Sequence, residues 1–127
     1  MKRFKIERSR ITPEISYDPK TKTLEIEGRS YPENTEEFYE PLFNWIEGLS
    51  QRTFGILKIS IKLDYLNTSS TKVIINALYK MEQICKIQNN QIMVNWYYKR
   101  EDEDILETGE VLSKILSVPI KLVELVA

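Results

Sequence analysis

The stretch GILKISIKLDYLNTSS, from Gly55 to Ser70, decides the fold class. Residues 55–66 alternate apolar and polar side chains and are rich in β-branched residues, which is typical of a β-strand. A short polar run follows, and apolar residues then recur at helical spacing from Val73 to Cys85. A long strand that passes through a polar turn into a helix indicates an α/β fold.

The rest of the chain extends this pattern in both directions. We expect strands near residues 4–7, 14–18, 23–28, 91–98 and 118–125, and helices over residues 36–49, from Ser69 or Ser70 to about 88, and from Asp104 to about 116, with Thr35 capping the first. The order β-β-β-α-β-α-β-α-β predicts one mixed sheet. Its C-terminal half should be parallel with right-handed crossovers, and its N-terminal strands should form an antiparallel edge.

Length and composition place limits on the function. The 127 residues fit one domain over 1–127, and the 18 basic and 19 acidic side chains leave no positive field for nucleic acid. The lack of histidine removes the commonest general base and zinc ligand, and excludes a Ser-His-Asp triad. Cys85, the one cysteine, lies in an apolar-periodic stretch, so we expect a buried thiol in a reducing cytoplasm. We find no leader and no membrane-spanning run.

Thr68 is the candidate functional residue. It follows strand 55–66, and in open α/β sheets binding sites gather where the carboxyl ends of parallel strands lead into helices. A helix start offers free backbone N–H groups and a positive dipole end, which favour a phosphate. The same position also suits simple capping, because Asn67, Thr68, Ser69 and Ser70 are all ordinary N-cap residues. The residue pattern alone leaves both interpretations open.

Four separated motifs carry a resemblance to a known family. They are DYLNTSSTK at residues 64–72, SYPEN at 30–34, TPEI at 12–15 and VNWYY at 94–98. In this order they resemble the SiaC family of bacterial regulatory phosphoproteins, over about residues 6–124.

The resemblance implies a fold related to anti-sigma factor antagonists (STAS-like domains) and a non-enzymatic signalling role without cofactor or metal. In that family the Thr of Asn-Thr-Ser-Ser is phosphorylated by a histidine-kinase-like Ser/Thr kinase and dephosphorylated by a PP2C-type phosphatase. The unphosphorylated form activates a diguanylate cyclase, which raises cyclic di-GMP and promotes biofilm formation. By motif the phosphoacceptor is Thr68, and Asn67, Ser69 and Ser70 surround it.

The loop after strand 91–98 should emerge at the same edge of the sheet. Lys99 or Arg100 would then meet a phosphate, while the alternative is a solvated turn whose acids at 101–104 favour the next helix start. Trp96 and Tyr98 should face one side of the sheet and Tyr97 the other, which favours packing under helices over a base-stacking platform.

Two other functions stay open. One is a small acid-based hydrolase or transferase that uses Asp64, Glu33 or Glu101, although none of these carboxylates lies at a recognised motif spacing. The other is a constitutive structural subunit without a switch. The loop from Tyr31 to Asn34 either borders the partner surface or only caps a helix.

Overall fold

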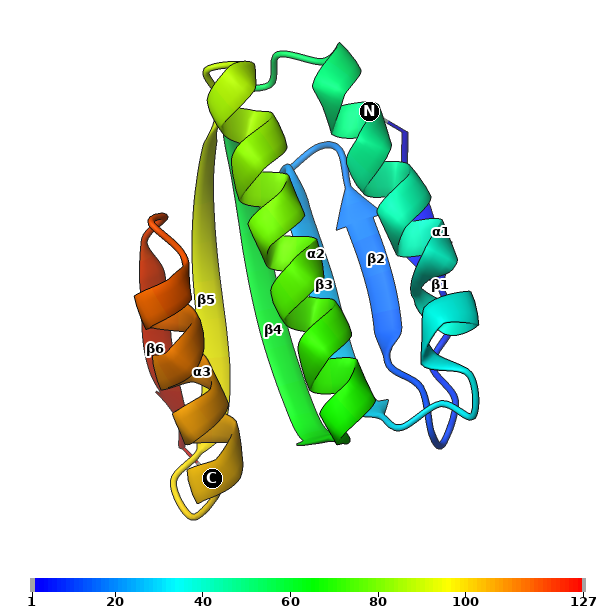
Figure 1. Ribbon diagram of the computed structural model, residues 1–127, viewed down its shortest axis with the longest axis vertical. Helices are drawn as coiled ribbons and strands as arrows, with labels where there is room; N and C mark the ends of the chain where they lie inside the picture. The colour runs from blue at the N-terminus through cyan, green and yellow to red at the C-terminus, as the bar shows by residue number, and fades with distance from the viewer. Residues whose placement is uncertain (1, 127) are drawn as a thin grey trace.

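The computed structural model describes residues 2–126 as one sheet covered by helices on a single face (Figure 1). The sheet has six strands in the order β1-β2-β3-β4-β5-β6. β1 to β3 are antiparallel, and β3 to β6 are parallel to one another, which confirms the predicted mixed topology. The bounds of the strands are β1 Phe4–Ile6, β2 Glu14–Asp18, β3 Thr23–Ser30, β4 Ile56–Leu66, β5 Gln91–Lys99 and β6 Ile120–Leu125.

Each parallel connection contains a helix. These are α1 Thr35–Gly48, followed by the short 3-10 helix η1 Leu49–Gln51, then α2 Thr68–Ile87 and α3 Glu103–Ile115. Because the strands follow one another in chain order across the sheet, all three crossovers place their helices on the same face. Among residues 2–126, no helix is both long enough and apolar enough to cross a membrane.

The helix starts lie slightly earlier than the sequence predicts. Asn34, not Thr35, caps α1, because its side-chain oxygen accepts a hydrogen bond from the Glu37 backbone N–H at 3.1 Å. Asp102 caps α3 in the same way, so that helix begins at Glu103 rather than Asp104. In both helices an Asn or Asp side chain accepts a hydrogen bond from the backbone N–H three residues further on.

The core lies between the sheet and the helices. Along β4 the side chains of Leu57, Ile59, Ile61 and Leu63 are buried, while the intervening ones are exposed or half-buried. Trp96 of β5 is completely buried, and its indole N–H donates to the Ile105 carbonyl of α3 at 2.9 Å. One face of the sheet is therefore buried under the helices, and the other faces solvent.

The aromatic run of β5 divides between these two faces, as predicted. Tyr98 packs against the core on the side of Trp96, whereas Tyr97 lies on the uncovered face. There the ammonium of Lys62 sits 4.7 Å from the Tyr97 ring centroid. The expectation of packing under helices is therefore wrong for Tyr97, because helices cover only one face.

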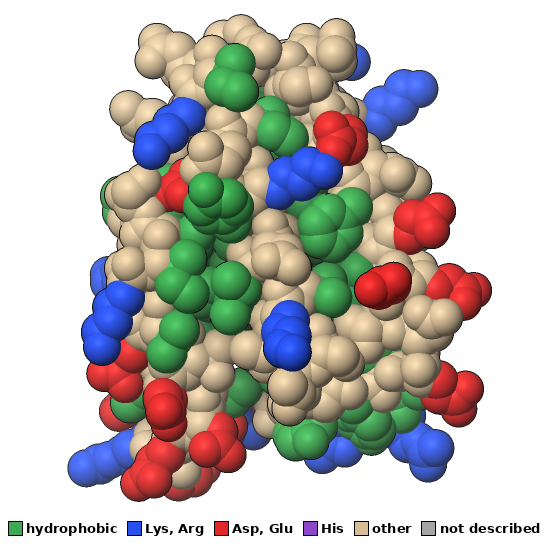
Figure 2. Space-filling model, viewed as in Figure 1, with side chains coloured by type: hydrophobic (Ala, Val, Ile, Leu, Met, Phe, Trp, Pro, Cys, Tyr) green, Lys and Arg blue, Asp and Glu red, His purple; other side chains and the backbone are tan. Residues whose placement is uncertain are grey.

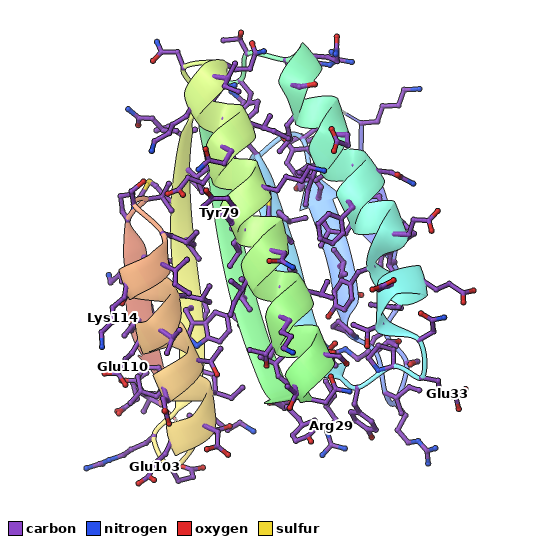
Figure 3. The ribbon with its side chains drawn as sticks, in the orientation of Figure 1. Arg29, Glu33, Tyr79, Glu103, Glu110 and Lys114 are labelled. Carbon is purple, nitrogen blue, oxygen red and sulfur yellow. The ribbon has the colours of Figure 1, made fainter. Side chains whose placement is uncertain are left out.

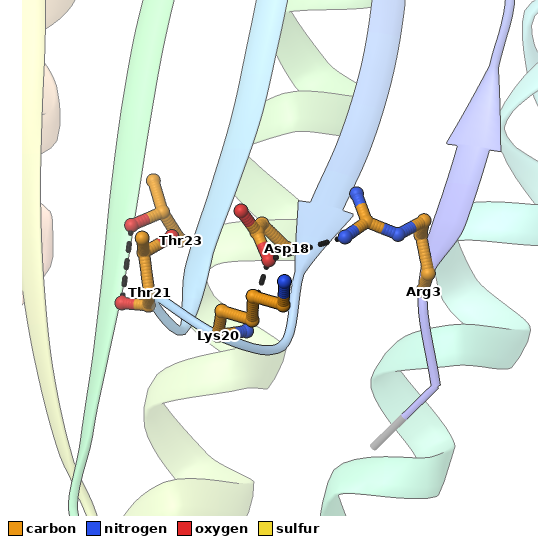
Figure 4. A network of polar contacts seen from close by, with 5 residues as sticks. All are labelled: Arg3, Asp18, Lys20, Thr21 and Thr23. Carbon is orange, nitrogen blue, oxygen red and sulfur yellow. Dashed lines mark hydrogen bonds and ion pairs between the residues drawn. The ribbon is translucent and has the colours of Figure 1, made fainter.

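A polar turn fixes the antiparallel edge (Figure 4). The Asp18 carboxylate accepts a hydrogen bond from the Lys20 backbone N–H at 2.9 Å and pairs with the Arg3 guanidinium at 3.5 Å. Lys22 takes the positive φ of 54° that the tight connection requires. The turn thus joins β2 to β3 and holds the N-terminal segment beside them.

Candidate partner-binding site at the start of helix α2

Three helices begin at one end of the sheet, where β3, β4 and β5 end (Figure 1). The backbone links two of these strand ends directly, since the Asn67 N–H donates to the Ser30 carbonyl at 3.0 Å. The sequence prediction that Thr68 lies at this edge is confirmed. Open α/β sheets bind their ligands and partners at such an edge.

Asn67 organises the start of α2. Its backbone is extended, and its side-chain oxygen accepts from the Ser70 N–H at 2.9 Å and from the Ser69 hydroxyl at 3.3 Å. The Thr71 hydroxyl donates to the Asn67 carbonyl at 3.1 Å. Thr68 is consequently the first residue of α2. The sequence had suggested that Thr68 lies just before the helix.

The three hydroxyls of Thr68, Ser69 and Ser70 have different environments. Ser70 is completely buried and accepts a hydrogen bond from Ser30 at 2.7 Å. Ser69 is exposed, but it shares a 2.8 Å hydrogen bond with Thr35 at the start of α1. Thr68 is exposed, and no hydrogen bond within residues 2–126 engages its hydroxyl. Only the Thr68 oxygen is thus both accessible and free.

A buried chain of hydroxyls supports this segment from below. Ser30 donates to Ser70, so the 2.6 Å contact between Ser30 and the Tyr39 phenol is donated by Tyr39. Tyr39 is completely buried, and desolvation by burial raises its pKa to about 12, although its hydrogen bonds to Ser30 and Ser70 act in the opposite direction. The chain connects α1, β3 and α2, which fixes the position of the α2 start.

The charge around Thr68 is distinctive. α1 carries Glu36 and Glu37 in its first turn, and α3 carries Glu103 and Asp104, whereas the first turn of α2 has no acid. The nearest charge along α2 is cationic, because Lys72 lies one turn from Thr68. Arg29, at the end of β3 (Figure 3), lies on the side of the sheet away from the helices, since its neighbour Ser30 faces Tyr39 and Ser70. The positive end of the α2 dipole is therefore not neutralised by a carboxylate.

Lys99 and Arg100 lie at the same edge as Thr68, as predicted, at and just beyond the end of β5. Lys99 pairs with Asp64 of β4 at 3.3 Å, and both side chains are about half exposed. In the described part of the chain, neither Lys99 nor Arg100 contacts Thr68 by a hydrogen bond or ion pair. The acids of this loop are explained by α3, because Asp102 caps it and Glu103 occupies its first turn.

The residues named for an acid-based enzyme do not converge. Asp64 pairs with Lys99, while Glu33 projects outward on the α1 side (Figure 3). Between residues 2 and 126, no three His, Cys, Asp or Glu side chains are grouped as a metal site requires. The Cys85 thiol is buried as expected, and burial raises its pKa to about 11, so it is protonated at neutral pH.

The loop from Tyr31 to Asn34 has a structural role. Asn34 caps α1, and the Tyr31 N–H donates to the Ile11 carbonyl at 2.8 Å. The Tyr31 ring also packs edge-on against Tyr65, which is 51% exposed, with 5.5 Å between their centroids. Tyr65 faces the uncovered side of the sheet, because it pairs with Arg29, whereas the adjacent pair of Ser30 and Leu66 faces the core.

A groove of about 250 Å³ runs between α2 and α3, beginning one turn from Thr68. Figure 2 shows hydrophobic side chains along this part of the molecule and acidic side chains gathered where α3 begins. Val111 and Tyr79 contribute exposed apolar area nearby. The groove is lined by Thr71, Ile75, Asp104, Glu107, Thr108 and Val111.

Sequence reasoning did not identify Ser30, Tyr39 or Thr35 as parts of this site. Ser30 lies 40 positions before Ser70, and only the pairing of β3 with β4 brings the two together. The one available signal was the SYPEN motif at 30–34, whose serine begins a segment that otherwise resembles an ordinary loop.

Comparisons with known proteins agree with this geometry. The profile of the SiaC family regulatory phosphoprotein matches residues 6–125. An uncharacterized protein of Pseudomonas aeruginosa strain UCBPP-PA14 is 31% identical over 108 residues, which is 85% of each chain.

Solved structures give the same result. SiaC of Pseudomonas aeruginosa is 27% identical with a TM-score of 0.86, over 98% of this chain and 100% of that one. A structure of the diguanylate cyclase SiaD in complex with its activator SiaC, from the same organism, matches at 28% identity and a TM-score of 0.86, over 96% and 99%. The chain thus belongs to the SiaC family of regulatory phosphoproteins.

Proposed function

We propose that this protein is a non-enzymatic signalling module whose partner binding is switched by phosphorylation of Thr68. The observation that carries the proposal is the difference between the three neighbouring hydroxyls. A kinase needs an exposed oxygen that is not already committed to the fold, and Thr68 meets that need. Ser69 and Ser70 hold α2 against α1 and β3 instead.

The fold would accommodate a phosphate at Thr68. The first turn of α2 has no acid, and the positive end of its dipole would favour the added charge of about −1.5 to −2. Lys72, one turn along the helix, adds positive potential nearby. Phosphorylation would therefore change the surface without unfolding the helix.

The same phosphate would alter recognition. Without it, the start of α2 is the one helix start at this edge that has no acid in its first turn, because α1 and α3 both begin with acids. With it, all three starts become negative. A partner that packs closely on Thr68 and the adjacent α2–α3 groove would lose contact through bulk and desolvation.

The expected partners follow from the relatives. A family member binds the diguanylate cyclase SiaD as its activator. We propose that unphosphorylated Thr68 marks the form that activates such a cyclase here, so that the switch regulates cyclic di-GMP and biofilm formation. A Ser/Thr kinase and a PP2C-type phosphatase would set the switch, and all of these partners would act in the cytoplasm.

The other site residues take supporting roles in this proposal. Asn67 and Ser70 hold the position of Thr68, and Ser69 links it to α1. Lys99, held by Asp64, and Arg100 would form the neighbouring rim that a partner touches.

Binding measurements with charge variants test the proposal. Thr68→Glu should weaken binding of a cyclase partner at least ten-fold relative to the unmodified chain, while Thr68→Ala should bind normally and resist phosphorylation. Lys114→Gln provides a matched control, because it also makes the net charge one unit more negative but lies on the outward side of α3 (Figure 3). Equal binding by Thr68→Glu and Thr68→Ala would contradict the switch.

A further inference from the structure

A cleft lies at the opposite end of α1 from the candidate site. It has a volume of about 480 Å³ and separates the N-terminal segment from the C-terminal half of α1. Figure 1 shows the chain just before β1 beside that half of the helix. The distance from Thr35 to Gly48 is about 20 Å along the helix axis, so the cleft is separate from the Thr68 surface. Its lining is Lys2, Arg3, Phe4, Pro41, Asn44, Trp45, Gly48 and Arg52.

Aromatic rings form one part of this cleft. The Trp45 and Phe4 rings are nearly parallel, with an interplanar angle of 22° and 6.2 Å between centroids. Tyr17 fixes Trp45 from the core side, at 4.9 Å between centroids. Trp45 is held in place yet only half-buried, so it offers a preformed apolar surface to a flat ring.

Positive charge forms the other part. Lys2, Arg3 and Arg52 line the cleft, and no acidic residue does. Arg3 pairs with Asp18, whereas no ion pair within residues 2–126 engages Lys2 or Arg52. Two cations therefore face the cleft without a local carboxylate, and an anionic group would find them available.

Gly48 supplies an independent observation. Its backbone has ordinary helical angles, with φ −63° and ψ −20°, so the conformation does not require glycine. A Cβ at this position would meet no atom within 4 Å, so crowding does not require glycine either. Glycine costs up to about 1 kcal/mol relative to alanine in a helix interior, and less at a helix end such as Gly48, the last residue of α1. Its presence in the cleft wall is explained if a ligand approaches the backbone there.

From these contacts we infer that the cleft binds a purine nucleotide carrying a di- or triphosphate. The base would lie against Trp45 and Phe4 next to the open wall at Gly48, and the phosphates would lie among Lys2, Arg52 and Arg3. Asn44 supplies an amide for hydrogen bonds to the base or ribose. The binding is reversible and involves no chemical step.

Titration with ADP and GDP tests the inference on the whole chain. The protein has two tryptophans, and Trp96 is completely buried, so quenching by a bound base would report Trp45. Calorimetry gives the affinity independently of fluorescence. We expect at least one of the two nucleotides to bind. Its own nucleoside, adenosine or guanosine, supplies the base alone and tripolyphosphate supplies the phosphates alone, and each should bind at least ten-fold more weakly.

Variants of the cleft make the test specific. Gly48→Leu should weaken binding at least ten-fold by filling the open wall, while Gly48→Ala should stay within about three-fold. Arg52→Gln should weaken binding about five-fold or more. Lys114→Gln removes the same charge from the outward side of α3 and should have no effect. Thermal melts of each variant separate lost binding from lost folding.

Three results would overturn the inference. One is the absence of heat and quenching for both nucleotides up to millimolar concentration. Another is binding of tripolyphosphate, or of the corresponding nucleoside, as tightly as the nucleotide. The third is unchanged affinity in a folded Gly48→Leu variant.

Discussion

The starts of α2 and α3 lie at the same edge of the sheet and are capped alike, yet they differ in charge. Asn67 and Asp102 each accept a hydrogen bond from a backbone N–H three residues on, at 2.9 and 3.1 Å. Two acids follow Asp102 in the first turn of α3, whereas hydroxyl residues alone occupy the first positions of α2. Acidic side chains therefore already compensate the positive end of the α3 dipole, while the positive end of the α2 dipole has no such side chain and would favour an added anion.

The two helices are also held to the sheet differently. α3 lies close to β5, where the Trp96 indole N–H bonds to Ile105 and Gly109 leaves room for the same ring. α2 is joined through the hydroxyls of Ser70 and Ser30. Close packing against Trp96 thus positions α3, whereas buried hydrogen bonds position α2, the helix that carries Thr68.

The largest expected loss of stability tests whether close packing against Trp96 positions α3. A Cβ at Gly109 would lie 2.5 Å from Trp96 Cδ1, so Gly109→Ala should lower the free energy of unfolding by about 3 kcal/mol. Gly48→Ala is the matched control and should raise it by up to about 1 kcal/mol, because nothing crowds that position. Urea unfolding measures both, and similar effects at the two glycines would contradict the close approach of α3.

Alkaline pH tests the polar network under α2. The pKa of Tyr39 is about 12 in the folded chain and near 10.0 when unfolded, so the folded state holds this proton more tightly. Its contribution is fully present below pH 10 and is lost as pH rises toward 12, by roughly 2 kcal/mol.

Other groups also titrate in this range, since burial raises the pKa of Cys85 to about 11. The difference between the wild type and Tyr39→Phe isolates the tyrosine. Stability curves from pH 9 to 12 should converge as the pH rises. Parallel curves would show that Tyr39 is not buried in its neutral form.

Substituting the N-cap residues of α2 and α3 separates the contribution of cap charge from that of the cap hydrogen bond. Asn67→Ala and Asp102→Ala should each cost about 1 kcal/mol. Because Asp102 also interacts with the helix dipole as a charge, its effect should shrink in 1 M salt, while that of Asn67 should not. Chemical unfolding at low and high salt measures the four values. The same salt dependence for both would remove the proposed contrast.

The smallest expected effect concerns Thr68 itself. Thr68→Ala should change the free energy of unfolding by no more than about 0.5 kcal/mol, since its hydroxyl makes no hydrogen bond within residues 2–126. Ser70→Ala should cost about 1 to 2 kcal/mol, because Ser30 would lose its buried acceptor. A large loss on changing Thr68 would assign it a structural role.

The sequence was most informative where periodicity and turn chemistry agree. The alternation over residues 55–66 and the spacing from Val73 to Cys85 predicted β4, α2 and the parallel half of the sheet. The last strand was placed at 118–125 but begins at Ile120, because the Ser117 and Val118 backbone N–H groups bond instead to the buried Glu82 carboxylate. Such a contact joins residues 35 and 36 positions apart, which no local pattern reveals.

The candidate site was predictable in position but not in detail. Helix-start chemistry treats the four residues from Asn67 to Ser70 as equivalent caps, and only the family resemblance singled out Thr68. The structure distinguishes them through distant partners, since Thr35 binds Ser69 and Ser30 binds Ser70. These contacts depend on how α1 and β3 pack beside α2.

The most direct test of the Thr68 switch is to map the phosphate on the wild-type chain by mass spectrometry after incubation with the proposed Ser/Thr kinase and ATP. We expect one phosphate, carried by Thr68, and none on Ser69, Ser70 or Thr71. A phosphate on Ser69 or Ser70, or modification that persists in Thr68→Ala, would contradict the claim that exposure and a free hydroxyl select the site.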